Sequence, residues 1–174
     1  MKMSWQQIPS PIITEILCKY ADGVVLDTEH GCFNNESISA CIQVATLAKK
    51  HCFIRLTEIS NTLIRHCLDS GATGLIFSTV ETEEQARLIK KLSYYLIGPY
   101  DLSLSLNVPG KFDNEQFLCY INKVKEKVPE SKLAVHIPND VKNQIHKYKG
   151  YGLKCLGMDT MALLDYHKEI IKNA

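Results

Sequence analysis

The sequence predicts an α/β fold of the (β/α)8 or TIM-barrel type that lacks about one β/α unit. Short β-rich runs alternate with helical patterns along the whole 174-residue chain, giving seven strand–helix units. Such alternation predicts a parallel sheet with right-handed crossovers, either doubly wound or closed into a barrel. Short strands, almost all followed by polar residues, favour the barrel. Because a full barrel has about 250 residues and eight units, residues 1–174 should form a single incomplete domain, open or completed by oligomerisation.

Four strands and three helices are expected in the first part of the chain. Pro9 and Pro11 open the first helix, where proline is favoured, and Gly23 ends it. Asn35 is the expected N-cap of the second helix, and Gly71 caps the third, which begins at Asn61. The expected strands are Met3–Ile8, Val24–Leu26, Cys52–Ile54 and Gly74–Phe77.

The second part of the chain continues the alternation. Thr82 begins a helix that extends to about Lys91, and a strand at Tyr94–Ile97 follows it. Further helices are expected at Asn114–Val128, at Asn139–Tyr148 and from about Met161 to the end of the chain. The last two strands are expected at Lys132–Ile137 and Lys154–Leu156.

The composition argues against several classes of protein. A net charge of +1 gives no reason to expect nucleic acid or an anionic membrane as a partner. No apolar run is long enough for a membrane span, and the first residues lack the apolar core of a signal peptide. Seven widely spaced cysteines without a CxxC motif suggest reduced core residues in a cytoplasmic protein. Dinucleotide, P-loop and G-x-S-x-G motifs are absent from the sequence.

Polar residues follow the predicted strands and would form one cluster if the strands close on each other. Asp27 and His30 are three residues apart, so the carboxylate could hold the imidazole and set its tautomer for a general base. Alternatively, Asp27 caps a loop and His30 is a surface residue. The cluster comprises Asp27, Glu29, His30, Arg55, Ser78, Thr79, Asp101 and His136.

The other members of the cluster also have two interpretations. Arg55 could bind a carboxylate or a developing enolate, or it could form a structural ion pair with Glu29 or Glu58. Asp101 is a hard oxygen donor suited to Mg²⁺ or Mn²⁺, or else the N-cap of the turn that follows it. His136 precedes Ile-Pro, and we expect it to be structural.

Two segments carry motifs that make a chance match improbable. They are GVVLDTEHG at residues 23–31 and IGPYDLSLSL at residues 97–106. With them the sequence resembles the HpcH/HpaI aldolase family over nearly the whole chain. Weaker matches lie at residues 5–11, 54–55, 69–76 and 157–160.

The resemblance implies a (β/α)8 barrel of the pyruvate/phosphoenolpyruvate type, usually oligomeric through exchange of the last helices. Family members cleave or form a carbon–carbon bond next to a 2-oxo acid. We therefore expect a cytoplasmic, homo-oligomeric class II aldolase that converts 4-hydroxy-2-oxo acids into pyruvate and an aldehyde. The family holds a divalent metal through a Glu on strand five and an Asp on strand six.

The resemblance also assigns residues to roles. Asp101 matches the metal-binding Asp, and Arg55 matches the arginine that stabilises the enolate. Asp27 and His30 match the pair that moves protons through metal-bound water. The expected substrate-binding residues are Trp5, Gly98, Pro99, Tyr100 and Asp101.

One departure from the family concerns the metal. The fifth strand and its Q-x-E motif are missing between Tyr95 and Leu96, and only Glu81 or Glu83 could take over the Glu ligand. A single carboxylate holds Mg²⁺ poorly. Strand Gly74–Phe77 must then pair with Tyr94–Ile97, or both leave open edges.

Two alternative functions remain open. One is a catalytically impaired relative that binds an oxo acid or a protein partner, and the other is a different α/β enzyme that works without metal.

Overall fold

A computed structural model describes residues 1–78 and 93–173 and shows one sheet of seven parallel strands. Their order across the sheet is β4-β3-β2-β1-β7-β6-β5. The predicted number of strands is therefore confirmed, and so is the α/β class. The strands are β1 (Lys2–Gln6), β2 (Gly23–Asp27), β3 (His51–Leu56), β4 (Gly74–Phe77), β5 (Tyr95–Ile97), β6 (Leu133–Ile137) and β7 (Leu153–Leu156).

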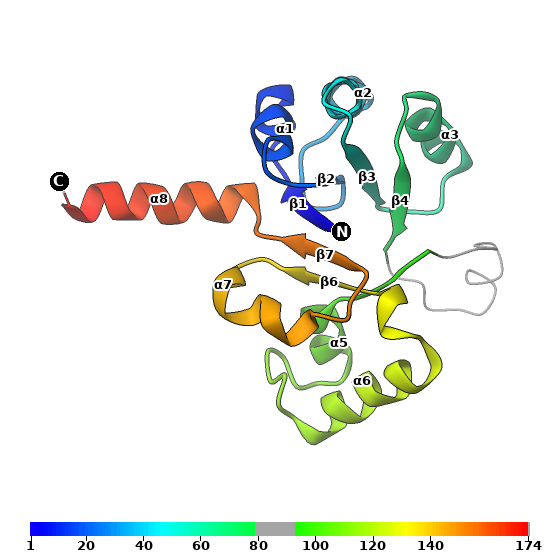
Figure 1. Cartoon of the computed structure of the whole chain (residues 1–174), viewed down its shortest axis with the longest axis vertical. Coiled ribbons are helices and arrows are strands. Elements are labelled where there is room, and N and C mark those ends of the chain that lie inside the picture. Colours follow the sequence, from blue (N-terminus) through cyan, green and yellow to red (C-terminus); the bar gives the residue numbers. More distant parts are fainter. Residues whose placement is uncertain (79–92, 174) are drawn as a thin grey trace.

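The sheet is curled like part of a barrel but is not closed (Figure 1). β4 pairs only with β3, and β5 pairs only with β6, within the described residues. Of the two expected arrangements, the one with two open strand edges is therefore the one observed. The gap lies between β4 and β5, so the described residues form an incomplete barrel.

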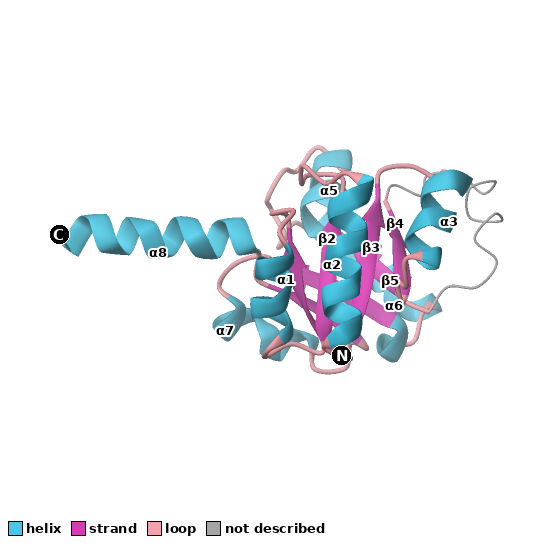
Figure 2. Cartoon of the chain, turned by 90° about the horizontal axis from the view of Figure 1, so that it is seen from above, coloured by secondary structure: helices cyan, strands magenta, loops and turns pink. Residues whose placement is uncertain are grey.

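Helices cover the outer face of this sheet, and α1, α2 and α3 lie side by side over β1, β2 and β3 (Figure 2). Short 3-10 helices at Glu130–Lys132 and Ile145–Tyr148 complete the described elements. The helix expected from Thr82 to Lys91 lies outside the described residues. The helices are α1 (Pro11–Cys18), α2 (Asn35–Leu47), α3 (Asn61–Asp69), α5 (Pro99–Ser105), α6 (Glu115–Lys127), α7 (Val141–Gln144) and α8 (Asp159–Asn173).

Several element boundaries differ from the sequence prediction. The N-cap of α2 is Asn34 rather than Asn35, because Asn34 Oδ1 accepts the Ser37 N–H and Ser37 Oγ accepts the Asn34 N–H in return. The helix expected at Asn139–Tyr148 is divided into α7 and a 3-10 turn. Arg55, expected to follow the strand at Cys52–Ile54, lies inside β3.

The core lies on both faces of β2, which is buried along its entire length. The outer face of β2 packs with Cys41 and Ile42 of α2, and the inner face packs with Trp5. Five of the seven cysteines are buried, as predicted, whereas Cys32 and Cys119 are exposed and correct that prediction. Burial raises the pKa of the Cys52 thiol, so this residue is an inert packing group.

The start of α8 is tied to the end of β1. Asp159 Oδ1 accepts a hydrogen bond from the Gln7 N–H at 2.9 Å, and its Oδ2 accepts one from the Ile8 N–H at 2.9 Å. The same Oδ1 also accepts the Thr160 N–H at 2.8 Å. The helix therefore begins at Asp159, two residues before the predicted Met161.

Beyond this attachment α8 projects away from the rest of the molecule in both views (Figures 1 and 2). Only Asp159 is buried in the whole helix. Five large apolar side chains of α8 are exposed, namely Leu163, Leu164, Tyr166, Ile170 and Ile171. Within the described ranges, none of the helices combines the length and the apolar character needed to cross a membrane.

Candidate active site

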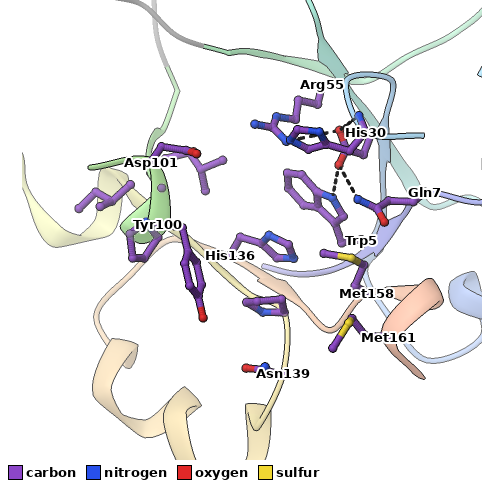
Figure 3. A pocket seen from close by; sticks show the side chains of 16 residues that line it. Trp5, Gln7, His30, Arg55, Tyr100, Asp101, His136, Asn139, Met158 and Met161 are labelled. Carbon is purple, nitrogen blue, oxygen red and sulfur yellow. Dashed lines mark hydrogen bonds and ion pairs between the residues drawn. The ribbon is translucent and has the colours of Figure 1, made fainter. Parts of the chain in front are cut away.

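A pocket of about 310 Å³ lies at the carboxyl ends of the strands. Residues from β1, β2, β3, β5, β6 and β7, or from the loops after them, line it (Figure 3). The predicted convergence of polar residues is thus observed for most of the cluster. All eight residues that the sequence assigned to the site line the pocket: Trp5, Asp27, His30, Arg55, Gly98, Pro99, Tyr100 and Asp101.

Asp27, at the end of β2, is the most connected side chain of the pocket. It is 1% exposed, and its Oδ2 accepts hydrogen bonds from Trp5 Nε1 at 2.9 Å and Gln7 Nε2 at 3.2 Å. Its Oδ1 accepts the backbone N–H groups of Glu29 and His30 and lies 3.4 Å from Arg55 Nη1. The carboxylate therefore organises three strands and its own loop.

The same contacts keep Asp27 ionised. Burial alone would raise the pKa of this carboxyl, but the hydrogen bonds from Trp5 and Gln7 and the charge of Arg55 outweigh burial, and the pKa is lowered. An ionised, fully engaged carboxylate is a poor proton donor. Asp27 is thus suited to positioning other groups.

His30 differs from the sequence expectation. Asp27 accepts the backbone N–H of His30 at 3.3 Å and makes no hydrogen bond to its imidazole among the described residues. The imidazole is instead near Glu29, with 3.9 Å between Nε2 and Oε1, and its side chain is 58% exposed. The ring is accessible to the pocket, but Asp27 does not set its tautomer. A loop carboxylate bonds the nearest N–H groups first, and those are in its own backbone.

Arg55 is held between two carboxylates. Its Nη2 lies 2.9 Å from Glu29 Oε2, and its Nη1 lies 3.4 Å from Asp27 Oδ1, while 15% of its side chain is exposed. Of the two possible structural partners, Glu29 is the one observed. Glu29 Oε2 is fully buried and makes no hydrogen bond of regular geometry within the described residues. Its ion pair with Arg55 Nη2 is therefore what mainly offsets the cost of burying its negative charge.

Trp5 lines the pocket and contacts two other side chains that line it. The guanidinium carbon of Arg55 lies 5.7 Å from the centre of the indole, and the His136 ring stacks on the indole at 4.1 Å and 15°. Figure 3 shows the indole between these two side chains. Stacking and cation–π contacts of this kind add directional stabilisation to burial. The ring positions are therefore fixed before any ligand binds.

Asp101 lies on the opposite side of the pocket, in the first turn of α5. It is exposed, and a Cβ added to Gly98 would be 2.6 Å from its Oδ2, so the carboxylate extends over the beginning of its own helix. Gly98, not Asp101, is the N-cap, which corrects the capping alternative. A carboxylate in the first turn is favoured by the helix dipole.

The described residues do not by themselves fit a divalent metal. They contain no group of three His, Cys, Asp or Glu side chains that could hold an ion. Asp101 offers one carboxylate, and both oxygens of Asp27 are occupied by protein donors. Mg²⁺ requires octahedral oxygen coordination, which one carboxylate does not support. Glu81 and Glu83, the possible replacements, lie outside the described residues, as does Thr79.

Sequence reasoning missed half of the pocket lining. Ser78 does not take part, because its hydroxyl donates to the Leu56 carbonyl oxygen at 2.7 Å. His136 does line the pocket, although the sequence suggested a structural role. The signal for His136 was its position at the end of a strand. The pocket residues to which the sequence assigned no binding or catalytic role are Gln7, Leu96, Ile97, His136, Pro138, Asn139, Met158 and Met161.

Solved structures of known proteins have a similar fold. A crystal structure of the citrate synthase SbnG matches with a TM-score of 0.83 over 99% of this chain and 91% of that chain, at 21% identity. An HpcH/HpaI aldolase/citrate lyase family protein from Burkholderia cenocepacia also has a TM-score of 0.83, over 99% of this chain and 93% of that chain, at 15% identity. The resemblance to the HpcH/HpaI aldolase family is confirmed.

One sequence relative supports the same family. The chain is 35% identical over 92 residues to a hydroxypyruvate/pyruvate aldolase from Roseovarius nubinhibens. The match covers 52% of this chain and 36% of that aldolase, so it spans little more than a third of the aldolase's length. No protein-family model matches the chain. The shared fold places the pocket at the strand ends, as in any barrel of this type.

Proposed function

We propose that the chain is a carbon–carbon lyase of the HpcH/HpaI aldolase type, which converts 4-hydroxy-2-oxo acids into pyruvate and an aldehyde. The observation that carries the proposal is the placement of Asp27, His30, Arg55 and Asp101 around one pocket at the strand ends. The aldolase relative from Roseovarius nubinhibens supports the reaction class. We place the protein in the cytoplasm, since its seven free cysteines suit a reducing compartment.

In the cleavage reaction the C4 hydroxyl loses its proton, and the C3–C4 bond breaks to release the aldehyde. The electron pair of that bond remains as the enolate of pyruvate, which then takes up a proton at C3. Arg55 is the cation placed to stabilise the enolate oxygen, because its guanidinium borders the pocket. His30 is the exposed base that can accept the hydroxyl proton and return it to C3.

The positive charge of Arg55 is already neutralised by the carboxylates of Asp27 and Glu29, so Arg55 alone gives the pocket no net positive charge to bind an anionic acid. An additional cation would supply that positive charge. The requirement for Mg²⁺ or Mn²⁺ therefore belongs to the proposal, with Asp101 as the ligand that the resemblance implies. We assign no chemical step to the metal, because the described residues do not complete its coordination.

The experiment is a coupled assay for pyruvate with 4-hydroxy-2-oxopentanoate, run with and without Mn²⁺, on the wild type, Arg55→Lys and Asp101→Ala. Arg55→Lys keeps the positive charge but loses the fork that spans the two carboxylates. We expect it to lower kcat by about a hundredfold or more. Mn²⁺-dependent turnover that Asp101→Ala abolishes would support the metal ligand, whereas full activity of Arg55→Lys would contradict the role of Arg55.

A second candidate is a catalytically impaired relative that keeps the pocket for binding an oxo acid. The observation that favours it is the open sheet, in which β4 and β5 do not pair within the described residues. Saturable binding of pyruvate or oxalate without turnover at any Mn²⁺ concentration would favour this candidate over the lyase.

We also propose that the protein is a homo-oligomer assembled through α8. An isolated helix of about 15 residues is marginal in water. Among the described residues, only Asp159 of α8 is buried, and beyond its first turn the helix projects away from its own chain. Its exposed apolar side chains, from Leu163 to Ile171, would gain from burial against a second copy.

A further inference from the structure

His136 is the pocket side chain that the proposed reaction does not use. Its imidazole lies against the Trp5 indole, with the ring planes 15° apart, and its Nε2 lies 3.2 Å from the Gly157 carbonyl oxygen. The stack fixes the plane of the ring, and the hydrogen bond fixes its rotation. A side chain held in two ways at the edge of a pocket is preorganised for a ligand.

The hydrogen bond to Gly157 also determines which nitrogen is free. Burial lowers the pKa of His136 to about 4, so the ring is neutral near pH 7. A neutral imidazole has one N–H, and it must be on Nε2 because a carbonyl oxygen can only accept. Nδ1 is therefore an acceptor with an available lone pair.

No hydrogen bond from the described residues reaches this Nδ1. His136 lines the pocket, so the lone pair of its Nδ1 can accept a hydrogen bond from a ligand there.

We propose that Nδ1 of His136 accepts a hydrogen bond from a hydroxyl group on the aldehyde-derived half of the ligand, so that the site selects hydroxyaldehydes. The proposal rests on the proposed lyase function. Arg55, which would hold the oxo oxygen, and His136 lie on either side of the Trp5 indole in Figure 3. The C5 hydroxyl is farther from the C2 oxygen than the C4 hydroxyl is. With the oxo oxygen at Arg55, it is therefore the C5 hydroxyl that we place at His136.

Two acids that differ by this hydroxyl test the proposal, namely 4,5-dihydroxy-2-oxopentanoate and 4-hydroxy-2-oxopentanoate. Trp5 is the only tryptophan in the chain and lies in the pocket, so its fluorescence on mixing reports binding without requiring turnover. One hydrogen bond of ordinary strength gives about a threefold to tenfold preference. We expect the wild type to bind the dihydroxy acid more tightly by this factor and to show the same preference in kcat/KM.

Three variants separate the acceptor from the rest of the side chain. His136→Leu removes both nitrogens, and the preference should fall to near one. His136→Asn places an amide oxygen near the position of Nδ1 and should retain part of the preference, whereas His136→Gln reaches only the position of Nε2 and should lose it. Thermal unfolding of each variant shows whether it is folded, and the Asn–Gln comparison holds even if the Leu variant is not.

The outcomes distinguish this proposal from the proposed function. A wild-type preference that persists in His136→Leu and His136→Gln would overturn the role of His136, even if both acids are cleaved. Binding of both acids with a preference that depends on His136, but without cleavage, would support the role and contradict the lyase. Failure of the wild type to bind either acid would overturn both.

Discussion

Asp27 is the single residue on which the geometry of the pocket depends. Its carboxylate bonds Trp5, Gln7 and Arg55, which come from two different strands and the loop after one of them. Each of these donors would be left without its partner if the carboxylate were removed. Because the removal would leave the buried donors of Trp5 and Gln7 unsatisfied and Arg55 with Glu29 as its only partner, the cost exceeds that of an ordinary polar contact.

Replacing Asp27 should therefore cost stability as well as activity. We expect Asp27→Ala to lower the free energy of unfolding by about 3–5 kcal/mol. The control is Asp101→Ala, an exposed aspartate on the same pocket, which should change it by less than about 1 kcal/mol. Urea unfolding followed by circular dichroism measures both. Equal effects of the two substitutions would show that Asp27 does not organise the site.

The same contacts explain which site residues could be predicted. Asp27 and Arg55 follow or lie in short apolar runs, so a barrel places both at the pocket. The contact of Glu29 with Arg55 and the position of His30 depend on loop geometry, which residue types do not specify. Gln7 was not predicted, and His136 was placed in the cluster but expected to be structural, because their positions depend on long-range contacts, with Asp27 and with Trp5 respectively.

Helix boundaries could be predicted where local residues determine them and not where long-range contacts do. The end of α3 was predictable, because Gly71 has a φ of +103° that glycine adopts readily. Helix α5 was not predicted, since its seven residues include too few apolar positions to show a period. The start of α8 depends on Asp159 bonding the backbone after β1, a contact that no local pattern signals.

The exposed apolar face of helix α8 is the expected contact with a second copy of the chain. Leu164 and Ile171 are seven residues apart, on one face of the helix, and are 47% and 65% exposed. If this face binds a second copy, Leu164→Lys with Ile171→Lys should convert an oligomer into a 19.7 kDa monomer in light scattering after gel filtration. Glu169→Lys changes the charge of α8 by the same amount and should leave the oligomer intact. A monomeric wild type would contradict the proposal.

The molecule as a whole is a barrel interrupted at one place. The alternation of strands and helices was enough to predict seven parallel strands. β2, which lies inside the sheet between β3 and β1, is fully buried, as a strand covered on both faces should be. Whether the two end strands would meet could not be decided from the sequence, because barrel closure depends on strand tilt and stagger. In the structure they do not meet within the described residues.

Hydrogen exchange of the folded protein tests this openness. An edge strand leaves alternate N–H groups without a partner strand, so those of β4 that do not bond β3, and those of β5 that do not bond β6, should exchange quickly. The amides of β2, paired on both sides with β1 and β3, should exchange slowest, near the rate set by global unfolding. Amide-resolved exchange followed by NMR measures all three strands in one sample. Protection of both edges equal to that of β2 would contradict an open sheet and would mean that another strand, from this chain or from a second copy, closes the barrel in solution.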